Sequence, residues 1–187
     1  IHLSSIHFGL TKNNEPYIHL NNYDPENKIF NNVWIELNQA YKKGIKIILM
    51  VGGAGGAFTT LFNNFEVYYK LLYNTIKNHS IINGIDLDVE EGVSIKNIKM
   101  LINRITKDFG SKFIISMAPL QYSLENDTPG MGGFIYKDLL NSEEGKLINY
   151  LNGQFYGSFD FNSYDCVIKN GYKENMIVIG MLSEEYN

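Results

Sequence analysis

Short hydrophobic runs alternate along the chain with longer stretches in which apolar residues recur at helical spacing. The short runs are rich in Ile, Val, Phe and Tyr, and each is closed by Gly, Pro or a polar turn, which is typical of β-strands. This pattern predicts six strands, at residues 1–8, 46–51, 81–89, 112–117, 147–156 and 176–181.

The longer stretches predict amphipathic helices between these strands. The first follows Asp24-Pro25 and ends at Gly44, and its apolar positions are Ile29, Val33, Leu37 and Ala40. A second apolar stripe consists of Phe65, Tyr69, Leu72 and Ile76. Ser94 is placed to cap a third helix that ends at Gly110 and has Ile95, Ile98, Ile102, Ile105 and Phe109 on one face. The pattern also indicates helices near residues 133–141 and 162–170.

Strands that alternate with helices predict an α/β fold with a parallel sheet. Two architectures fit the pattern: an open doubly wound sheet, or part of a (β/α)8 barrel. Both place functional groups at the carboxyl ends of the strands. We find no internal repeat or linker, so we expect residues 1–187 to form one unit.

Composition narrows the possible partners of the chain. Of its 187 residues, 44% are hydrophobic and 19% charged, as in a folded protein, and no stretch reaches the roughly 20 apolar residues of a membrane span. The net charge of -4 and the scattered lysines disfavour nucleic acid, whereas a neutral polysaccharide is compatible with them. Cys166 is the only cysteine, which excludes an internal disulfide and a Cys-based metal cluster.

The segment from Asn83 to Glu91 carries the candidate chemistry. Side chains alternate between the two faces of a strand, so we expect three acids to share one face: Asp86, Asp88 and Glu90. Flanking helices would cover the aliphatic residues between them. If the sheet closes into a barrel, the acids would then point into its interior.

Three carboxylates roughly 6–7 Å apart would repel one another in a poorly solvated site, so we expect at least one to hold a proton near neutral pH. Glu90, at the carboxyl end of the strand, is the candidate general acid. Asp88 could hydrogen-bond to Glu90 or to substrate, and Asp86 could share a proton with Asp88. Two other interpretations stay open: a solvated polar face, and a divalent metal site, which is less compatible with acids spread along one strand.

The acidic segment resembles the DGxDxDxE signature of the family 18 glycoside hydrolases, with Asn83 at the first position. Three other segments resemble motifs of that family in the same order. Residues 47–53 resemble its SxGG strand, with Met50 in place of Ser; residues 116–119 resemble its MAP segment; and residues 154–156 resemble its Q-x-Y strand.

The resemblance implies a (β/α)8 barrel, of which this chain would supply strands two to seven and leave strands one and eight outside. It implies a retaining hydrolase of chitin or other N-acetylglucosamine polymers, without a cofactor or a metal. Glu90 would protonate the glycosidic oxygen, and the substrate's own 2-acetamido group would be the nucleophile. Asp88 would orient that group, and Tyr156 would hydrogen-bond its oxygen. Gln154, Met117, Gly52 and Gly53 are the candidate substrate-binding residues.

Three alternatives remain beside this interpretation. The chain could be a lectin on the same scaffold, although such lectins typically lack the acid that is Glu90 here, or an enzyme that trims N-glycan cores. The loop from Gly52 to Gly56 could suggest a nucleotide site, but Phe58 stands where the third glycine of G-x-G-x-x-G is needed.

We expect extracellular action because the polymer lies outside most cells. The sequence does not indicate an oligomeric state.

Overall fold

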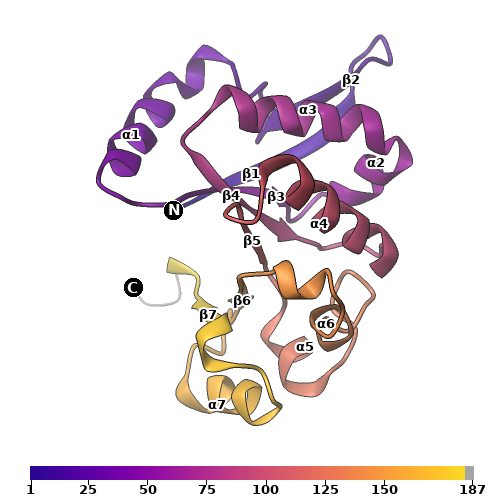
Figure 1. Ribbon diagram of the computed structural model, residues 1–187, viewed down its shortest axis with the longest axis vertical. Coiled ribbons are helices and arrows are strands. Elements are labelled where there is room, and N and C mark those ends of the chain that lie inside the picture. The colour runs from indigo at the N-terminus through magenta and orange to yellow at the C-terminus, as the bar shows by residue number, and fades with distance from the viewer. Residues whose placement is uncertain (184–187) are drawn as a thin grey trace. The chain divides into compact units, whose positions relative to one another are not determined.

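The computed structural model describes residues 1–183, and its strands follow one another in a sheet of order β2-β1-β3-β4-β5-β6-β7. The chain divides into two compact units, Ile1–Asp86 and Leu87–Asn187, and strand β4 (Ile82–Asp88) crosses from the first into the second. Figure 1 shows the elements along the chain. That residues 1–187 act as one domain stays a prediction.

In the first unit, strand β1 (His2–Leu10) runs parallel to β3 (Ile47–Gly52), with His2 opposite Ile48 and Leu3 opposite Leu49. The sequence pattern missed β2 (Pro16–Leu20), which returns antiparallel to β1 through a tight turn. Its proline stands at the first position, where a missing N–H does not interrupt the ladder.

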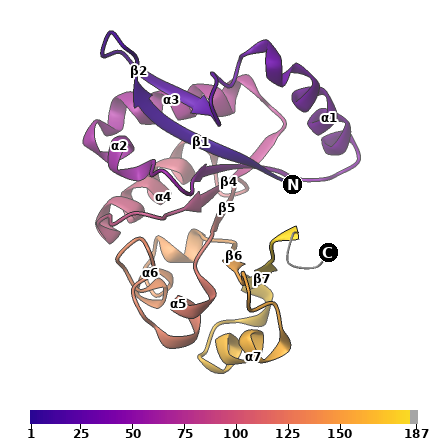
Figure 2. The ribbon, with the colours of Figure 1, turned by 180° about the vertical axis from the view of Figure 1, so that it is seen from behind.

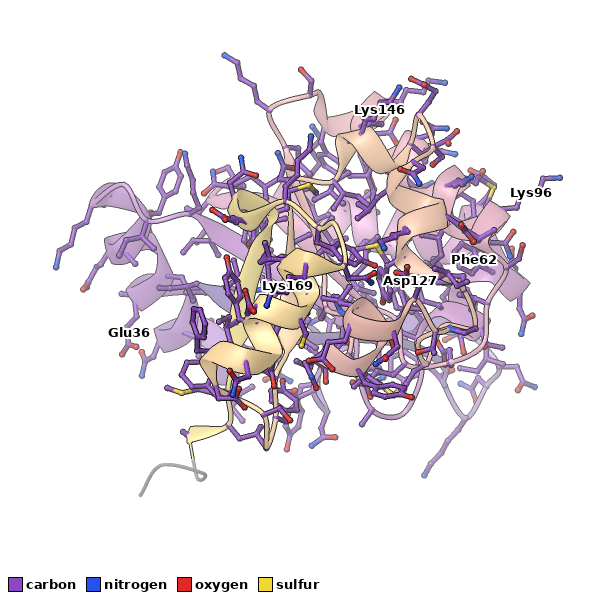
Figure 3. All side chains as sticks on the ribbon, turned by 90° about the horizontal axis from the view of Figure 1, so that it is seen from below. Glu36, Phe62, Lys96, Asp127, Lys146 and Lys169 are labelled. Carbon is purple, nitrogen blue, oxygen red and sulfur yellow. The ribbon has the colours of Figure 1, made fainter. Side chains whose placement is uncertain are left out.

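The helices of the first unit include the two that the pattern predicted. They are η1 (Lys28–Phe30), α1 (Asn31–Lys42), α2 (Phe58–Asn63) and α3 (Phe65–Asn78). Helix α3 packs along β2, as Figure 1 and Figure 2 both show. Tyr68 of α3 meets Phe8 edge-on at 5.6 Å between ring centroids, and its hydroxyl donates to Gly9 O at 3.2 Å. Phe62, labelled in Figure 3, stacks on Phe65 at the junction of α2 and α3.

In the second unit, β5 (Ile114–Met117), β6 (Tyr150–Gln154) and β7 (Ile177–Gly180) form parallel pairs in that order. The remaining elements of this unit are α4 (Ile95–Phe109), α5 (Gln121–Asn126), α6 (Tyr136–Leu140), η2 (Gly145–Leu147), α7 (Phe161–Lys169) and η3 (Glu174–Met176). The predicted strand 147–156 is therefore too long at both ends, because a 3-10 turn precedes β6 and the ladder ends at Gln154.

Helix α4 confirms the predicted capping and periodicity. The Ser94 side chain accepts a hydrogen bond from Lys96 N at 3.2 Å, and Gly110 ends the helix with φ of 85°. The predicted stripe is buried at Ile98, Ile102 and Ile105. This apolar face holds the helix in its unit, since packing rather than intrinsic propensity stabilises most protein helices.

Candidate functional site

One side-chain amide joins the two acids at the end of β4. Asp88 is the last residue of β4, Glu90 follows two positions later, and Gln154 is the last residue of β6. Gln154 Nε2 lies 3.0 Å from Asp88 Oδ1 and 3.4 Å from Glu90 Oε1, and it also lies 2.9 Å from the carbonyl oxygen of Ala118. The structure thus brings together three of the predicted site residues.

The shared amide has a chemical consequence. An NH2 group has two protons, so it can serve only two of these three acceptors well at one time. The bonds to the Ala118 carbonyl and to the Asp88 carboxylate are the two shorter ones. Glu90 is therefore the acceptor that can exchange its bond with Gln154 for a bond to another group. Asp88 is 5% exposed and Gln154 9%, so little water competes with these bonds.

Backbone pairing fixes the position of Gln154. Strands β5 and β6 align Met117 with Leu151, and Gln154 N donates to Pro119 O at 2.8 Å beyond the end of β5. Ala118 N in turn donates to Leu87 O at 3.3 Å. The carboxyl ends of these three strands therefore meet within the second unit, as parallel topology requires.

Met117 and Tyr156, also predicted for the site, differ in their surroundings. Met117 is fully buried at the end of β5. Tyr156 lies two residues beyond β6 and is 48% exposed, while its neighbour Phe155 is fully buried and donates its N–H to Gly180 O at 2.9 Å. Strand alternation therefore carries Gln154 into the site, but it does not extend to Tyr156.

The remaining predicted residues belong to the first unit. Asp86 is fully buried, and its Oδ2 lies 3.7 Å from His2 Nδ1. Gly52 ends β3 and Gly53 follows it, and both are buried, with φ of 97° and 86°. Such positive φ values strain other residues, so the backbone itself favours glycine here. That Asp86 shares a proton with Asp88 stays a prediction.

Within residues 1–183, no group of three His, Cys, Asp or Glu side chains is arranged to hold a metal ion. In the same range, no helix is long and apolar enough to cross a membrane. Cys166 is exposed on α7.

Sequence reasoning missed one group of polar residues. His7 of β1 and His19 of β2 lie opposite each other in the hairpin and stack, with ring centroids 5.6 Å apart. The alternation of Tyr17, Ile18, His19 and Leu20 was the available signal, because Ile18 and Leu20 are buried and the other two are not. That His7 and His19 face each other can be recognised only once the antiparallel pairing of β1 with β2 is known.

Comparison with known proteins identifies relatives of this chain. No family model matches the chain. It is 30% identical to a chitinase, ChiC, from Aspergillus fumigatus, with a TM-score of 0.85 over 95% of this chain and 64% of that one. It is 32% identical to a fungal endo-β-N-acetylglucosaminidase of glycosyl hydrolase family 18, with a TM-score of 0.82 and the same coverage of each chain. It is also 27% identical to Chitinase 2 of Rhizopus oligosporus over 71% of this chain and 26% of that protein.

The chain therefore spans 64% of the length of these two solved relatives. The likeness confirms the predicted α/β fold, a largely parallel sheet flanked by helices that matches part of a (β/α)8 barrel. The chain is homologous to the glycosidases of this family. In fold and sequence it is similar to chitinases and to an endo-β-N-acetylglucosaminidase of glycosyl hydrolase family 18.

Proposed function

We propose that this chain carries the acid–base residues of a retaining glycoside hydrolase that cleaves β-1,4-linked N-acetylglucosamine polymers. The observation that supports it best is the Gln154 amide shared by Asp88 and Glu90 at the carboxyl ends of neighbouring strands. This amide holds the carboxyl group of the proposed acid beside that of Asp88, where both can face the same substrate. Residues 1–187 are proposed to act as one catalytic domain.

In the proposed reaction, the Glu90 carboxyl gives its proton to the glycosidic oxygen as the C1–O bond breaks. The carbonyl oxygen of the substrate's 2-acetamido group attacks C1 and forms a cyclic oxazolinium ion. The Glu90 carboxylate then takes a proton from a water molecule, whose oxygen attacks C1 and reopens the ring. Two displacements at C1 retain the anomeric configuration.

The other predicted residues have supporting roles in this proposal. Positive charge develops on the acetamido group, so Asp88 is proposed to orient its N–H, and Tyr156 to hydrogen-bond its oxygen. Gln154 keeps the Asp88 and Glu90 carboxyl groups in place. Asp86, Met117, Gly52 and Gly53 are proposed to shape the surroundings of the substrate.

The test compares two neighbouring glutamates in the intact protein that contains this chain. With a fluorogenic chitotrioside, we expect Glu90→Gln to lower kcat by about a hundredfold or more, since general acid catalysis contributes roughly 10²–10⁴-fold. Glu91→Gln is the matched control and should keep most of the activity. Near-normal turnover in the Glu90 variant contradicts the assignment, and chitin binding without turnover in the unmodified protein favours the lectin.

The relatives support two substrate classes, because one is named a chitinase and the other an endo-β-N-acetylglucosaminidase, at 30% and 32% identity. The substrate is therefore proposed as either chitin or the chitobiose core of an N-glycan. Release of reducing sugar from chitotetraose, measured beside release of the glycan from a high-mannose glycopeptide, separates them. Both polymers are found outside cells, which supports extracellular action as part of the proposal.

A further inference from the structure

Two segments of the chain have the form Asn-x-Ser/Thr, the pattern in which asparagine is an acceptor for N-linked glycans. They are Asn78-His79-Ser80 and Asn126-Asp127-Thr128. Such a short pattern often arises by chance, so exposure and hydrogen bonding decide whether a segment can be modified. The structure separates the two segments, because it presents their side chains differently.

The first segment lies at a turn on the surface of the first unit. Asn78 is the last residue of α3, and Ile82 N donates to the carbonyl oxygen of His79 at 2.9 Å where the chain turns into β4. Asn78 and Ser80 are both exposed. The amide and the hydroxyl that define the acceptor pattern are therefore accessible in the folded unit as well as in the unfolded chain.

The middle residue of this segment holds the turn against the fold. The His79 ring stacks on Trp34 of α1, with ring centroids 3.6 Å apart. His79 Nε2 also lies 3.0 Å from Glu26 Oε1, and the His79 side chain is 14% exposed. Because this ring packs inward, the side chains of Asn78 and Ser80 remain on the outside of the turn.

The Asn78 amide can carry a sugar and keep its contact in the fold. Its Nδ2 donates to Glu26 Oε1 at 3.3 Å. A side-chain amide nitrogen has two hydrogens, and an N-linked sugar replaces only one of them. The other hydrogen remains available to Glu26, so modification does not require this surface contact to break.

The second segment does not meet these conditions. The hydroxyl oxygen of Thr128 is buried. The Asp127 carboxylate accepts from Lys137 Nζ at 2.6 Å and from Asn170 Nδ2 at 2.9 Å, so the middle of the segment is fixed in the fold. Asn126 is exposed, but the hydroxyl of its acceptor pattern is accessible only in an unfolded chain. The folded structure therefore favours modification of the first segment.

We infer that Asn78 is the attachment site of an N-linked glycan. The co-reactant is an oligosaccharide linked to a polyprenyl diphosphate, and Nδ2 of Asn78 attacks C1 of its first sugar. The C1–O bond breaks, the diphosphate leaves with the electron pair, and Nδ2 releases one proton as the N–C1 bond forms. The inference rests on the proposed function only for extracellular action, because this co-reactant meets proteins in the secretory pathway.

The position of Asn78 keeps a glycan away from the proposed acids. Asn78 precedes the amino end of β4, whereas Asp88 is at the carboxyl end of that strand. The strand from Ile82 to Asp88 spans about 20 Å at roughly 3.3 Å per residue. We therefore expect the glycan to leave turnover unchanged.

The test directs the intact protein that contains this chain through the secretory pathway of yeast. We expect the peptide that follows Lys77 to carry a glycan, and its enzymatic release should convert Asn78 to aspartate, which mass spectrometry detects. Ser80→Ala should abolish the modification, although it keeps the Asn78 amide and its contact with Glu26. Ser80→Thr is the matched control and should retain the glycan, because it keeps the hydroxyl.

The outcomes separate this inference from the proposed function. An unmodified Asn78 in the secreted protein overturns the inference, whether or not Asn126 carries a glycan and whether or not the protein is a hydrolase. If Asn78 is glycosylated but the protein turns over neither the fluorogenic chitotrioside nor an N-glycan substrate, the inference stands and the hydrolase is wrong. Equal kcat in the wild type and in Ser80→Ala supports a glycan placed away from the acids.

Discussion

The side-chain amide of Gln154 lies 3.0 Å from a carboxylate oxygen of Asp88, although 66 positions separate the two residues in sequence. The same nitrogen reaches Glu90 at 3.4 Å. Removing this donor leaves Asp88, which is 5% exposed, with one fewer partner. A buried carboxyl group that loses a hydrogen bond changes both its orientation and its affinity for a proton.

Gln154→Ala is therefore expected to lower kcat of the intact protein by about tenfold to a hundredfold, because hydrogen bonds to charged groups contribute about 1.5–3 kcal/mol. The effect should fall on kcat more than on KM, since the amide bonds to the acids. Steady-state kinetics on a fluorogenic chitotrioside measures it, with Gln39→Ala on the exposed face of α1 as the control. A rise in KM alone would make Gln154 a substrate-binding residue instead.

Gln154→Glu tests the same contact by its charge. The variant keeps the size of the side chain but replaces the donor with a third carboxyl group beside two others. Like charges favour protonated forms, so both limbs of the pH–rate profile should move to higher pH. An unshifted profile with wild-type kcat would mean that the amide does not act on the acids.

The position of Asp86 and Asp88 on one strand could be predicted because its signal is local. Period-two alternation within β4 places Asp86 and Asp88, and Ser94 caps α4 through a contact two residues away. The contact of the Gln154 amide with Asp88 and Glu90 depends instead on the register between strands such as β5 and β6, which no local pattern encodes. Period-two alternation holds only within a strand, so it does not place Tyr156, which lies beyond the end of β6 at Gln154. The His7–His19 pair was missed for the same reason, since it depends on the hairpin register.

Ser94→Ala is expected to destabilise the second unit through the start of α4. The variant removes the side-chain oxygen that accepts from Lys96 N at 3.2 Å, and losing such a cap costs about 0.5–2 kcal/mol. Urea denaturation followed by circular dichroism measures the free energy of unfolding. Ser94→Asp keeps an acceptor at this position and should stay close to the wild type. Equal losses in both variants would show that the cap is not the cause.

Met117→Ala distinguishes packing from binding. Met117 is fully buried at the end of β5, so truncation should lower the free energy of unfolding by about 2–5 kcal/mol. Met131, 38% exposed, is the control, and its replacement by Ala should change the free energy by less than about 0.5 kcal/mol. If Met117→Ala keeps its stability but loses affinity for triacetylchitotriose, the residue acts through the ligand rather than through the core.

Tyr172 makes the free energy of unfolding depend on pH in the alkaline range. Its hydroxyl is buried without a hydrogen-bond partner among residues 1–183, and burial together with the charges of Asp127 and Asp138 raises its pKa well above the ordinary value. The folded state therefore keeps this proton at a pH where the unfolded chain has released it. Stability from Tyr172 is fully present below about pH 10 and falls as pH rises further.

Tyr172→Phe should remove that alkaline loss and should raise the free energy of unfolding at neutral pH by about 1 kcal/mol, since it deletes an unsatisfied buried hydroxyl. The ring that Lys137 Nζ approaches at 5.4 Å from its centroid is retained in Phe. Urea denaturation at a series of pH values between neutral and alkaline measures both effects. Tyr122→Phe, at a side chain that is 61% exposed, should keep the wild-type slope. A Tyr172→Phe variant that is destabilised at neutral pH would mean that the hydroxyl bonds to a group such as an ordered water molecule.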